Sequence, residues 1–415
     1  LMRSSAASDV YKRQFLFITK QANKNMKIGV LCSYKFPEGM APSIRILSYC
    51  KGLVENGVNV EIHSFASIEQ DQGQPLSGII DGVKYQLSTY RKKKVNTILG
   101  TIEHQWRKVV CLRNIIKSHR QEKFDFLFFS FDKISLLYFF GPIIYLLGVK
   151  ILFIGDEFPE PIRQLKSSVP KSQLLLYRII YKFFCGRILM TNELKKFYNE
   201  QVCSKPTYIL CSVVKTDRFT NVVKSTHIDR PYLCYMGNMM IAKDNVDNII
   251  DAFSIVSERF PQYELRLYGT PNKNDLDFVK NCIEKHGLSN RVKIMGRVNF
   301  GDVPQILCDA TILLTSQPIT KRAAGGFPTK LAEYMLSHTP AIVTNVGEIH
   351  NYVKDGEHVY MVPPCNPIKY AEKIEYILTH PYESKIVSEN AYKLAMTDFN
   401  AKIATKGLVE FLNRL

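Results

Sequence analysis

The chain has 415 residues, of which 46% are hydrophobic and 22% charged, proportions typical of a globular protein and not of a disordered one. The length exceeds that of one ordinary core and predicts two domains. The formal net charge of +17 favours an anionic partner (a nucleotide, a nucleic acid or an anionic membrane surface), although a diffusely basic surface gives the same total.

The first 25 residues stand apart from the fold. From Met26 onward the sequence KIGVLCS has the pattern of a buried strand. The preceding peptide resembles translated sequencing-adapter sequence, and its apolar patch at 15–18 is shorter than the apolar core of a secretory signal. We therefore expect residues 1–25 to be an extraneous leader.

Strand and helix patterns alternate along the rest of the chain, which predicts parallel sheets with helices on both faces. The predicted strands are 27–32, 58–64, 124–130, 151–154, 187–191, 232–236, 264–268, 292–295, 311–315, 341–344 and 359–362, with helices such as 246–258, 276–286 and 329–337 between them. The polar stretch 221–230 is the predicted linker. We expect two doubly wound α/β domains, 26–225 and 226–390, and C-terminal helices over 391–415 that pack back toward the first domain.

The longest apolar run covers residues 134–149 and contains Ser135, Gly141 and Pro142. A membrane span needs about 20 such residues, so the run predicts a buried helix in preference to an interfacial segment. The basic run at 91–94 is interpreted as a solvated loop in preference to a membrane contact. The ten cysteines form no CxxC pair and have no histidine at ligand spacing, which predicts reduced, mostly buried thiols and a cytoplasmic protein.

The stretch GGFPTKLAEYM, residues 325–335, carries the most chemistry. Gly325 and Gly326 allow a close backbone approach to a ligand, and Pro328 suits the start of a helix whose free N–H groups attract a phosphate. Glu333 lies five residues further, roughly 7.5 Å along a helix axis, about the separation of a nucleotide's distal phosphate and its ribose. The alternative interpretation is a well-capped surface helix with a solvated glutamate.

The longer segment GFPTKLAEYMLSHTPAIVTNVGEIHNYVKDGEHVYMVPP resembles the donor-binding segment of glycosyltransferase family 4, the retaining "group 1" family. Three other segments resemble that family in the same order: FPEGMAPSIRILSYCKGLVENGVNVEIHS, YMGNMMIAKDNVDNIIDAFSIV and VKIMGRVNFGDVPQILCDATILL. The resemblance runs from Met26 to the C-terminus and is most specific over 231–365. It implies two Rossmann-like domains facing across a cleft, the glycosyltransferase B-type fold, with the acceptor on the first domain and a nucleotide-sugar donor on the second.

Position by position, the resemblance implies that Lys243 contacts the donor diphosphate, that Glu333 binds the ribose, and that Arg297 and Val298 flank the base. A cation beside the departing diphosphate also makes sense on its own, because it stabilises charge that develops in the transition state. The full expected donor-binding set is Gly39, Gly237, Asn238, Lys243, Arg297, Val298, Arg322, Gly326, Phe327, Pro328, Thr329, Lys330 and Glu333.

Three positions depart from the family pattern. Asn238 stands where the family usually has an arginine, and Gly325 stands where it has the first of two glutamates; Arg322 could supply some of the missing positive charge. Asp156 and Glu157 stand where a histidine is often found. They either orient an acceptor hydroxyl or begin a turn closed by Pro159 and Pro161. With Lys243 and Glu333, Asp156 and Glu157 complete the expected catalytic set.

No metal or cofactor is expected. Asp275-Leu276-Asp277 has the form of a metal-binding acidic triplet, but it follows Pro271 and opens a helix, which favours capping. The chain has no GxxxxGK[ST] or GxGxxG sequence, which disfavours P-loop and nicotinamide enzymes, and no HExxH sequence.

Together these features predict a retaining, metal-independent hexosyltransferase of the cell-surface polysaccharide type. It would move a sugar from a nucleotide-diphosphate-sugar donor to a glycan or lipid-linked acceptor, in the cytoplasm or as a peripheral protein at the inner face of the membrane. Nucleic acid is not an expected partner. Two alternatives stay open: a nucleotide-sugar epimerase of the same fold, and a donor-binding protein that has lost turnover, which the residues Asn238 and Gly325 motivate.

Overall fold

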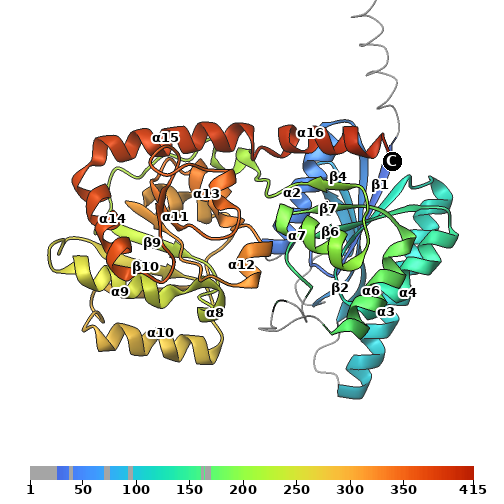
Figure 1. The fold of residues 1–415 in the computed structure, drawn as a ribbon, viewed down its shortest axis with the longest axis horizontal. Helices are drawn as coiled ribbons and strands as arrows, with labels where there is room; N and C mark the ends of the chain where they lie inside the picture. Colours follow the sequence, from blue (N-terminus) through green and yellow to red (C-terminus); the bar gives the residue numbers. More distant parts are fainter. Residues whose placement is uncertain (1–25, 37–40, 70–74, 92–96, 160–162, 164–169) are drawn as a thin grey trace, which may run out of the picture.

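The computed structural model describes residues 26–36, 41–69, 75–91, 97–159, 163 and 170–415 (Figure 1). The leader 1–25, the predicted donor residue Gly39, the lysines at 92–94 and Pro161 lie outside the described residues. Two sheets organise the described chain, one with strand order β3-β4-β2-β1-β5-β6-β7-β8 and one with order β11-β10-β9-β12-β13-β14. Every pair of neighbouring strands is parallel except β3–β4. The predicted pair of doubly wound α/β domains is therefore confirmed.

The first sheet is covered on both faces. Its strands are β1 (Lys27–Cys32), β2 (Asn59–Glu69), β3 (Ser77–Ile80), β4 (Val83–Arg91), β5 (Phe126–Ser130), β6 (Lys150–Gly155), β7 (Phe184–Leu189) and β8 (Thr207–Ile209). One face packs against α3 (Thr97–Gln121), α4 (Ile134–Leu146) and α6 (Lys171–Ile180). The other face packs against α2 (Ala41–Glu55) and the C-terminal helix α16 (Ala401–Leu412). Strands buried on both faces explain the continuous apolar runs in β1 and β5.

The second sheet has the same architecture. Its strands are β9 (Tyr232–Met236), β10 (Glu264–Tyr268), β11 (Val292–Gly296), β12 (Ile312–Leu314), β13 (Ala341–Thr344) and β14 (Tyr360–Val362). The helices between and after them are α8 (Ile241–Asp244), α9 (Val246–Ser257), α10 (Lys273–Lys285), α11 (Val303–Asp309), α12 (Lys321–Gly325), α13 (Lys330–Leu336), α14 (Pro367–Thr379) and α15 (Pro381–Thr397). The predicted acidic triplet opens α10, where Asn272 caps the helix by accepting the backbone N–H of Asp275 at 3.0 Å.

The chain crosses between the two domains twice. Residues 221–230 connect the short 3-10 helix η4 (Thr216–Phe219) to β9 without a helix or strand. The second crossing lies between α15 and α16, which run end to end across both domains in Figure 1. It brings α16 against α2 at Gly52, where an added Cβ atom would lie 2.2 Å from the carbonyl oxygen of Ala401.

Several element predictions need correction. The hairpin of β3 and β4 and the three-residue β8 were not predicted, and β7 occupies 184–189 where the prediction was 187–191. The hairpin turn uses Asp81 and Gly82, both with positive φ, an Asp-Gly signal for a tight turn. The apolar run 134–149 forms α4 over 134–146. One face of α4 is buried, but Leu146 is 83% exposed. Among the described residues no helix has the length and apolar character needed to cross a bilayer.

Candidate donor site at the domain boundary

The two domains meet through apolar and polar contacts. Phe158 and Leu194 of the first domain and Phe327 and Phe399 on the other side belong to one continuous core cluster. Gly325 fits against this boundary because an added Cβ atom would lie 2.6 Å from Phe158 and 3.2 Å from Leu194. In the structure, the close approach that Gly325 permits is to the first domain.

Glu157 lies at the centre of a cluster of cations from both domains. Its carboxylate accepts a hydrogen bond from Arg322 Nε at 3.0 Å and lies 3.9 Å from Lys243 Nζ, both in the second domain. Arg163 of the first domain forms a further ion pair with it. Burial would raise the pKa of Glu157, but Lys243, Arg322 and Arg163 outweigh it and the net pKa is lowered. Predicted residues from three separate segments of the sequence thus come together here.

Lys243 is held in α8, just after β9. Burial lowers the pKa of its ammonium group, while the charges of Glu157 and Asp244 oppose that shift. The side chain is still 37% exposed, so it lies at the surface of the boundary and within reach of a bound anion.

Asp156 has a different partner from its neighbour. It forms an ion pair with Arg45 of α2, whose side chain is 8% exposed. Burial raises the pKa of Asp156 despite Arg45. The backbone N–H of Arg163 donates to Pro159 O at 3.1 Å. Asp156 therefore pairs within the first domain, whereas its neighbour Glu157 faces the second domain.

Glu333 lies in α13 and is paired with Arg218 of η4. Arg218 also donates to the carbonyl oxygen of Phe300 at 2.9 Å, and its guanidinium carbon lies 3.5 Å from the centroid of the Phe300 ring. Phe300 follows β11 in the loop that contains the predicted base-flanking residues Arg297, which is exposed, and Val298, which packs partly against the core. Glu333 and the predicted base loop are thus bridged by one arginine.

Two further predicted residues, Lys330 and Gly237, lie close together in the second domain. Lys330 Nζ is 3.2 Å from Asp244 and 4.5 Å from the centroid of the Tyr235 ring. Gly237 follows β9, and an added Cβ atom there would lie 2.6 Å from Lys330 Nζ. The next residue, Asn238, is exposed.

The segment before α13 faces the first domain at two points. Phe327 donates its backbone N–H to the sulfur of Met190 at 3.1 Å. At Gly326 an added Cβ atom would lie 3.8 Å from Glu157 Cγ. Pro328 and Thr329 lead into α13, and Pro328 O accepts the backbone N–H of Leu331 at 2.8 Å.

Sequence reasoning missed three arginines of this boundary: Arg45, Arg163 and Arg218. Arg45 and Arg218 each pair with a carboxylate that is distant in sequence, and Arg163 pairs with Glu157, six residues before it. The one available signal was position, since Arg218 lies directly before the predicted linker.

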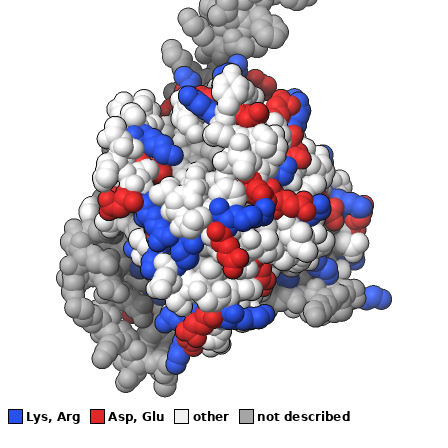
Figure 2. All heavy atoms as spheres, turned by 90° about the vertical axis from the view of Figure 1, so that its left-hand side faces the viewer, with Lys and Arg blue, Asp and Glu red and all other residues white. Residues whose placement is uncertain are grey.

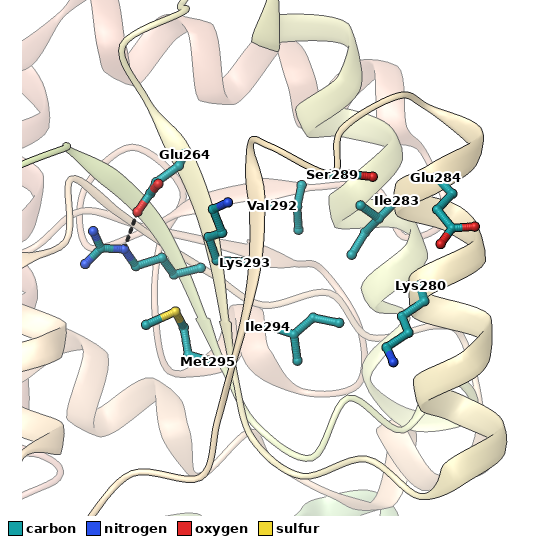
Figure 3. Close-up of a pocket in the computed structure, with 10 residues that line it drawn as sticks. Glu264, Lys280, Ile283, Glu284, Ser289, Val292, Lys293, Ile294 and Met295 are labelled. Carbon is teal, nitrogen blue, oxygen red and sulfur yellow. Dashed lines mark hydrogen bonds and ion pairs between the residues drawn. The ribbon is translucent and has the colours of Figure 1, made fainter.

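A separate hollow lies on the outer edge of the second sheet, between β11 and α10 (Figure 3). It is lined by residues that include Lys280, Lys293 and Met295, and by none of the predicted donor-site residues. In the part of the chain that the structure describes, no three His, Cys, Asp or Glu side chains are grouped as metal ligands.

Known proteins resemble both the sequence and the fold. Residues 217–394 match the family model described as "Glycosyl transferases group 1". An alpha-D-kanosaminyltransferase from Streptomyces kanamyceticus is 24% identical over 177 residues, which are 42% of this chain and 44% of that protein. A mannosylfructose-phosphate synthase from Agrobacterium fabrum is 29% identical over 124 residues, 28% of this chain and 26% of that protein. The chain therefore matches less than half the length of each of these relatives.

Solved structures resemble the chain over nearly its whole length. A sucrose-phosphate synthase from Thermosynechococcus elongatus has a TM-score of 0.71 at 14% identity, covering 94% of this chain and 98% of that one. Anabaena HepE in complex with UDP has a TM-score of 0.69 at 15% identity, covering 94% and 100%. This likeness confirms the predicted glycosyltransferase B-type fold. Over residues 217–394, which include the sheet of the second domain, the chain matches the group 1 glycosyltransferases, a family of transferase enzymes.

Proposed function

We propose that this protein transfers a sugar from a nucleotide-diphosphate-sugar donor to a glycan or lipid-linked acceptor, with retention of configuration and without a metal ion. The observation that carries the proposal is the meeting of Lys243 and Arg322 of the second domain with Glu157 of the first. Two cations at a domain boundary suit a diphosphate, and a carboxylate from the opposite domain suits an acceptor hydroxyl. Structures similar in fold have been solved with UDP and with UDP-glucose, which supports a nucleotide sugar as the donor.

In the proposed mechanism Lys243 and Arg322 bind the diphosphate and stabilise the negative charge that it gains as the bond to the sugar breaks. Glu333 binds the ribose hydroxyls. Retention follows if the acceptor attacks from the face that the diphosphate leaves, with a phosphate oxygen taking the acceptor proton. Glu157, whose pKa is lowered, is a weak base and is assigned to orienting the acceptor.

The protein would associate peripherally with the inner face of the membrane, and the outer side of α3 would make the contact. Ile102 and Trp106 are 59% and 60% exposed, and Val109 is 45% exposed. One further stretch of this helix lines a shallow hollow that combines Leu112 and Ile116 with three basic residues, Arg113, Lys117 and Arg120. Apolar and aromatic side chains interleaved with basic ones suit the interface of an anionic bilayer.

The direct test is a screen of UDP-, GDP-, ADP- and dTDP-sugars for thermal stabilisation of the protein, because a ligand that binds the folded state raises its stability by RT ln(1 + [L]/Kd). The stabilising donor is then incubated with the protein in EDTA, and released nucleotide and sugar products are measured. We expect turnover to survive chelation. Loss of activity that Mg²⁺ or Mn²⁺ restores would refute the metal-free mechanism, an epimerised donor without acceptor would identify an epimerase, and binding without turnover would identify a donor-binding protein.

A further inference from the structure

Arg218 is placed where it can control the nucleoside half of the donor site. It lies in η4, directly before the first crossing between the domains. Its side chain is 10% exposed. One terminal nitrogen pairs with Glu333, the other donates to Phe300 O at 2.9 Å, and the guanidinium covers the Phe300 ring. One side chain therefore connects α13 to the loop after β11.

The carboxylate of Glu333 depends on this contact. Burial raises the pKa of Glu333, and the charge and hydrogen bond of Arg218 oppose that rise. Lys330, one turn earlier in α13, is paired with Asp244 instead. In the described parts of the chain, Arg218 is the charged side chain that forms an ion pair with Glu333. Without it, little would keep a partly buried carboxyl group ionised.

The contact leaves room for a ligand on the same carboxylate. An ionised carboxylate has about four lone-pair positions, and Arg218 uses one of its oxygens. Two ribose hydroxyls can donate to the remaining positions. A protonated carboxyl group would lose acceptor capacity and offer a competing O–H donor, so the ribose contact requires the ionised form.

We propose that Arg218 is a positioning residue that fixes the Glu333 carboxylate against the loop 297–300, so that Glu333 binds the ribose while the loop receives the base. The inference rests on the proposed function, because it assigns a task within the same donor site. Arg218 itself need not touch the donor.

The test measures the dissociation constants of UDP, GDP, ADP and dTDP separately by calorimetry, from acidic to neutral pH, for wild type, Arg218→Gln and Arg218→Lys. The best-bound nucleotide should bind Arg218→Gln on the order of tenfold more weakly at neutral pH, as expected for the loss of a hydrogen bond to a charged group. The pH below which affinity falls should rise, because the pKa of Glu333 is no longer held down by the arginine. Arg218→Lys should restore the wild-type pH profile without restoring full affinity, since lysine supplies the charge but not the two-pronged contact.

Arg259→Gln is the matched control, because Arg259 pairs with Glu375 on the exposed surface of the second domain. It should leave affinity and pH profile unchanged. Melting curves establish that each variant is folded, and if Arg218→Gln does not fold, Arg218→Lys carries the test through its lowered affinity. If wild type binds a nucleotide, and the folded Arg218 variants bind it with the same affinity and the same pH profile, the positioning role alone is overturned. No binding of any of the four nucleotides to wild type would overturn the donor site and this inference with it.

Discussion

Glu157 and Glu333 are the two glutamates of the domain boundary, and their surroundings act on them in opposite directions. Three cations surround Glu157 and lower its pKa although it is largely buried. Glu333 has one arginine, and burial raises its pKa. Three neighbouring cations therefore favour the ionised form of Glu157, whereas the ionised form of Glu333 is favoured by one arginine, Arg218.

Substitution of Glu333 and of Lys243 should affect different kinetic constants. In the proposed site, Glu333→Ala removes the ribose contact in both ground and transition states. Donor binding should then weaken by about 1.5–3 kcal/mol for each charged hydrogen bond lost, and donor KM should rise accordingly. Lys243→Ala removes charge stabilisation that grows in the transition state, so kcat should fall on the order of 10²–10³-fold.

Steady-state kinetics and melting curves of both variants check this prediction. The side chains are 22% and 37% exposed, so neither variant should lose its fold. If both variants melt near wild type and turn over normally, the donor site has been assigned to the wrong residues.

Glu157→Gln should loosen the contact between the domains. The contact should then no longer depend on pH in the acidic range. The folded pKa of Glu157 lies below the ordinary value of 4.5, so its ion pairs contribute fully above 4.5 and are lost as pH falls through the folded pKa. In small-angle scattering, the radius of gyration of wild type should therefore increase in acid. Glu157→Gln should already have the larger radius at neutral pH.

Glu375→Gln is the control, since it breaks an exposed pair within the second domain. Identical scattering profiles for wild type and Glu157→Gln throughout the pH series would show that Glu157 does not hold the domains together.

At the scale of elements, most of the second sheet could be predicted from the sequence. The predicted bounds of β9, β10 and β13 match the structure. β9 and β13 are largely apolar, as strands buried on both faces are, whereas β10 alternates apolar residues with Glu264 and Arg266. β3 was missed because its residues alternate between exposed and half-buried at the sheet edge, and β8 because it has only three residues. The motif-bearing loops could be placed, but the arginines that pair with Glu333 and Asp156 could not. The Arg218–Glu333 contact depends on how the two domains pack, and the Arg45–Asp156 contact depends on how α2 packs against the first sheet.

The contact of α2 with α16 provides a test at this scale. At Gly52 an added Cβ atom would lie 2.2 Å from the backbone oxygen of Ala401, which cannot move as a flexible side chain could. Gly52→Ala should therefore destabilise the protein, by about 1–3 kcal/mol as for other overpacked sites. Gly100→Ala in α3 is the matched control, because nothing lies within 4 Å of the added atom.

Both substitutions bring the same gain in helix propensity, roughly 1 kcal/mol. Their difference in free energy of unfolding, from urea titrations, therefore isolates the steric clash. Equal stability of the two variants would show that α16 does not pack tightly on α2.

At the scale of the whole molecule, the net charge of +17 does not identify a binding surface by itself. Figure 2 views the second domain, where Lys and Arg lie beside Asp and Glu over much of the face. The combination of exposed apolar and basic residues on α3 lies on the first domain. A charged partner is therefore expected to meet the first domain at α3.

Sedimentation with anionic phospholipid vesicles tests this surface. Binding should weaken as salt rises, because exposed charges are screened within about 10 Å at 0.1 M. Trp106→Ser combined with Lys117→Glu should reduce binding at low salt, whereas Ile255→Ser, at an exposed position of α9, should not. Failure of wild type to bind vesicles at low salt would favour an acceptor free in solution.

The packing of α16 on α2 has a consequence for biosynthesis. The two helices lie at opposite ends of the described chain, yet they share the core on one face of the first sheet. A ribosome would release the second domain's strands before α16 is made, so the second domain, though later in sequence, can complete its core first. The first domain must wait, with the apolar face of α2 uncovered, until α16 emerges. Such an intermediate is a natural client for a chaperone, and its lifetime would depend on the rate at which α16 is translated.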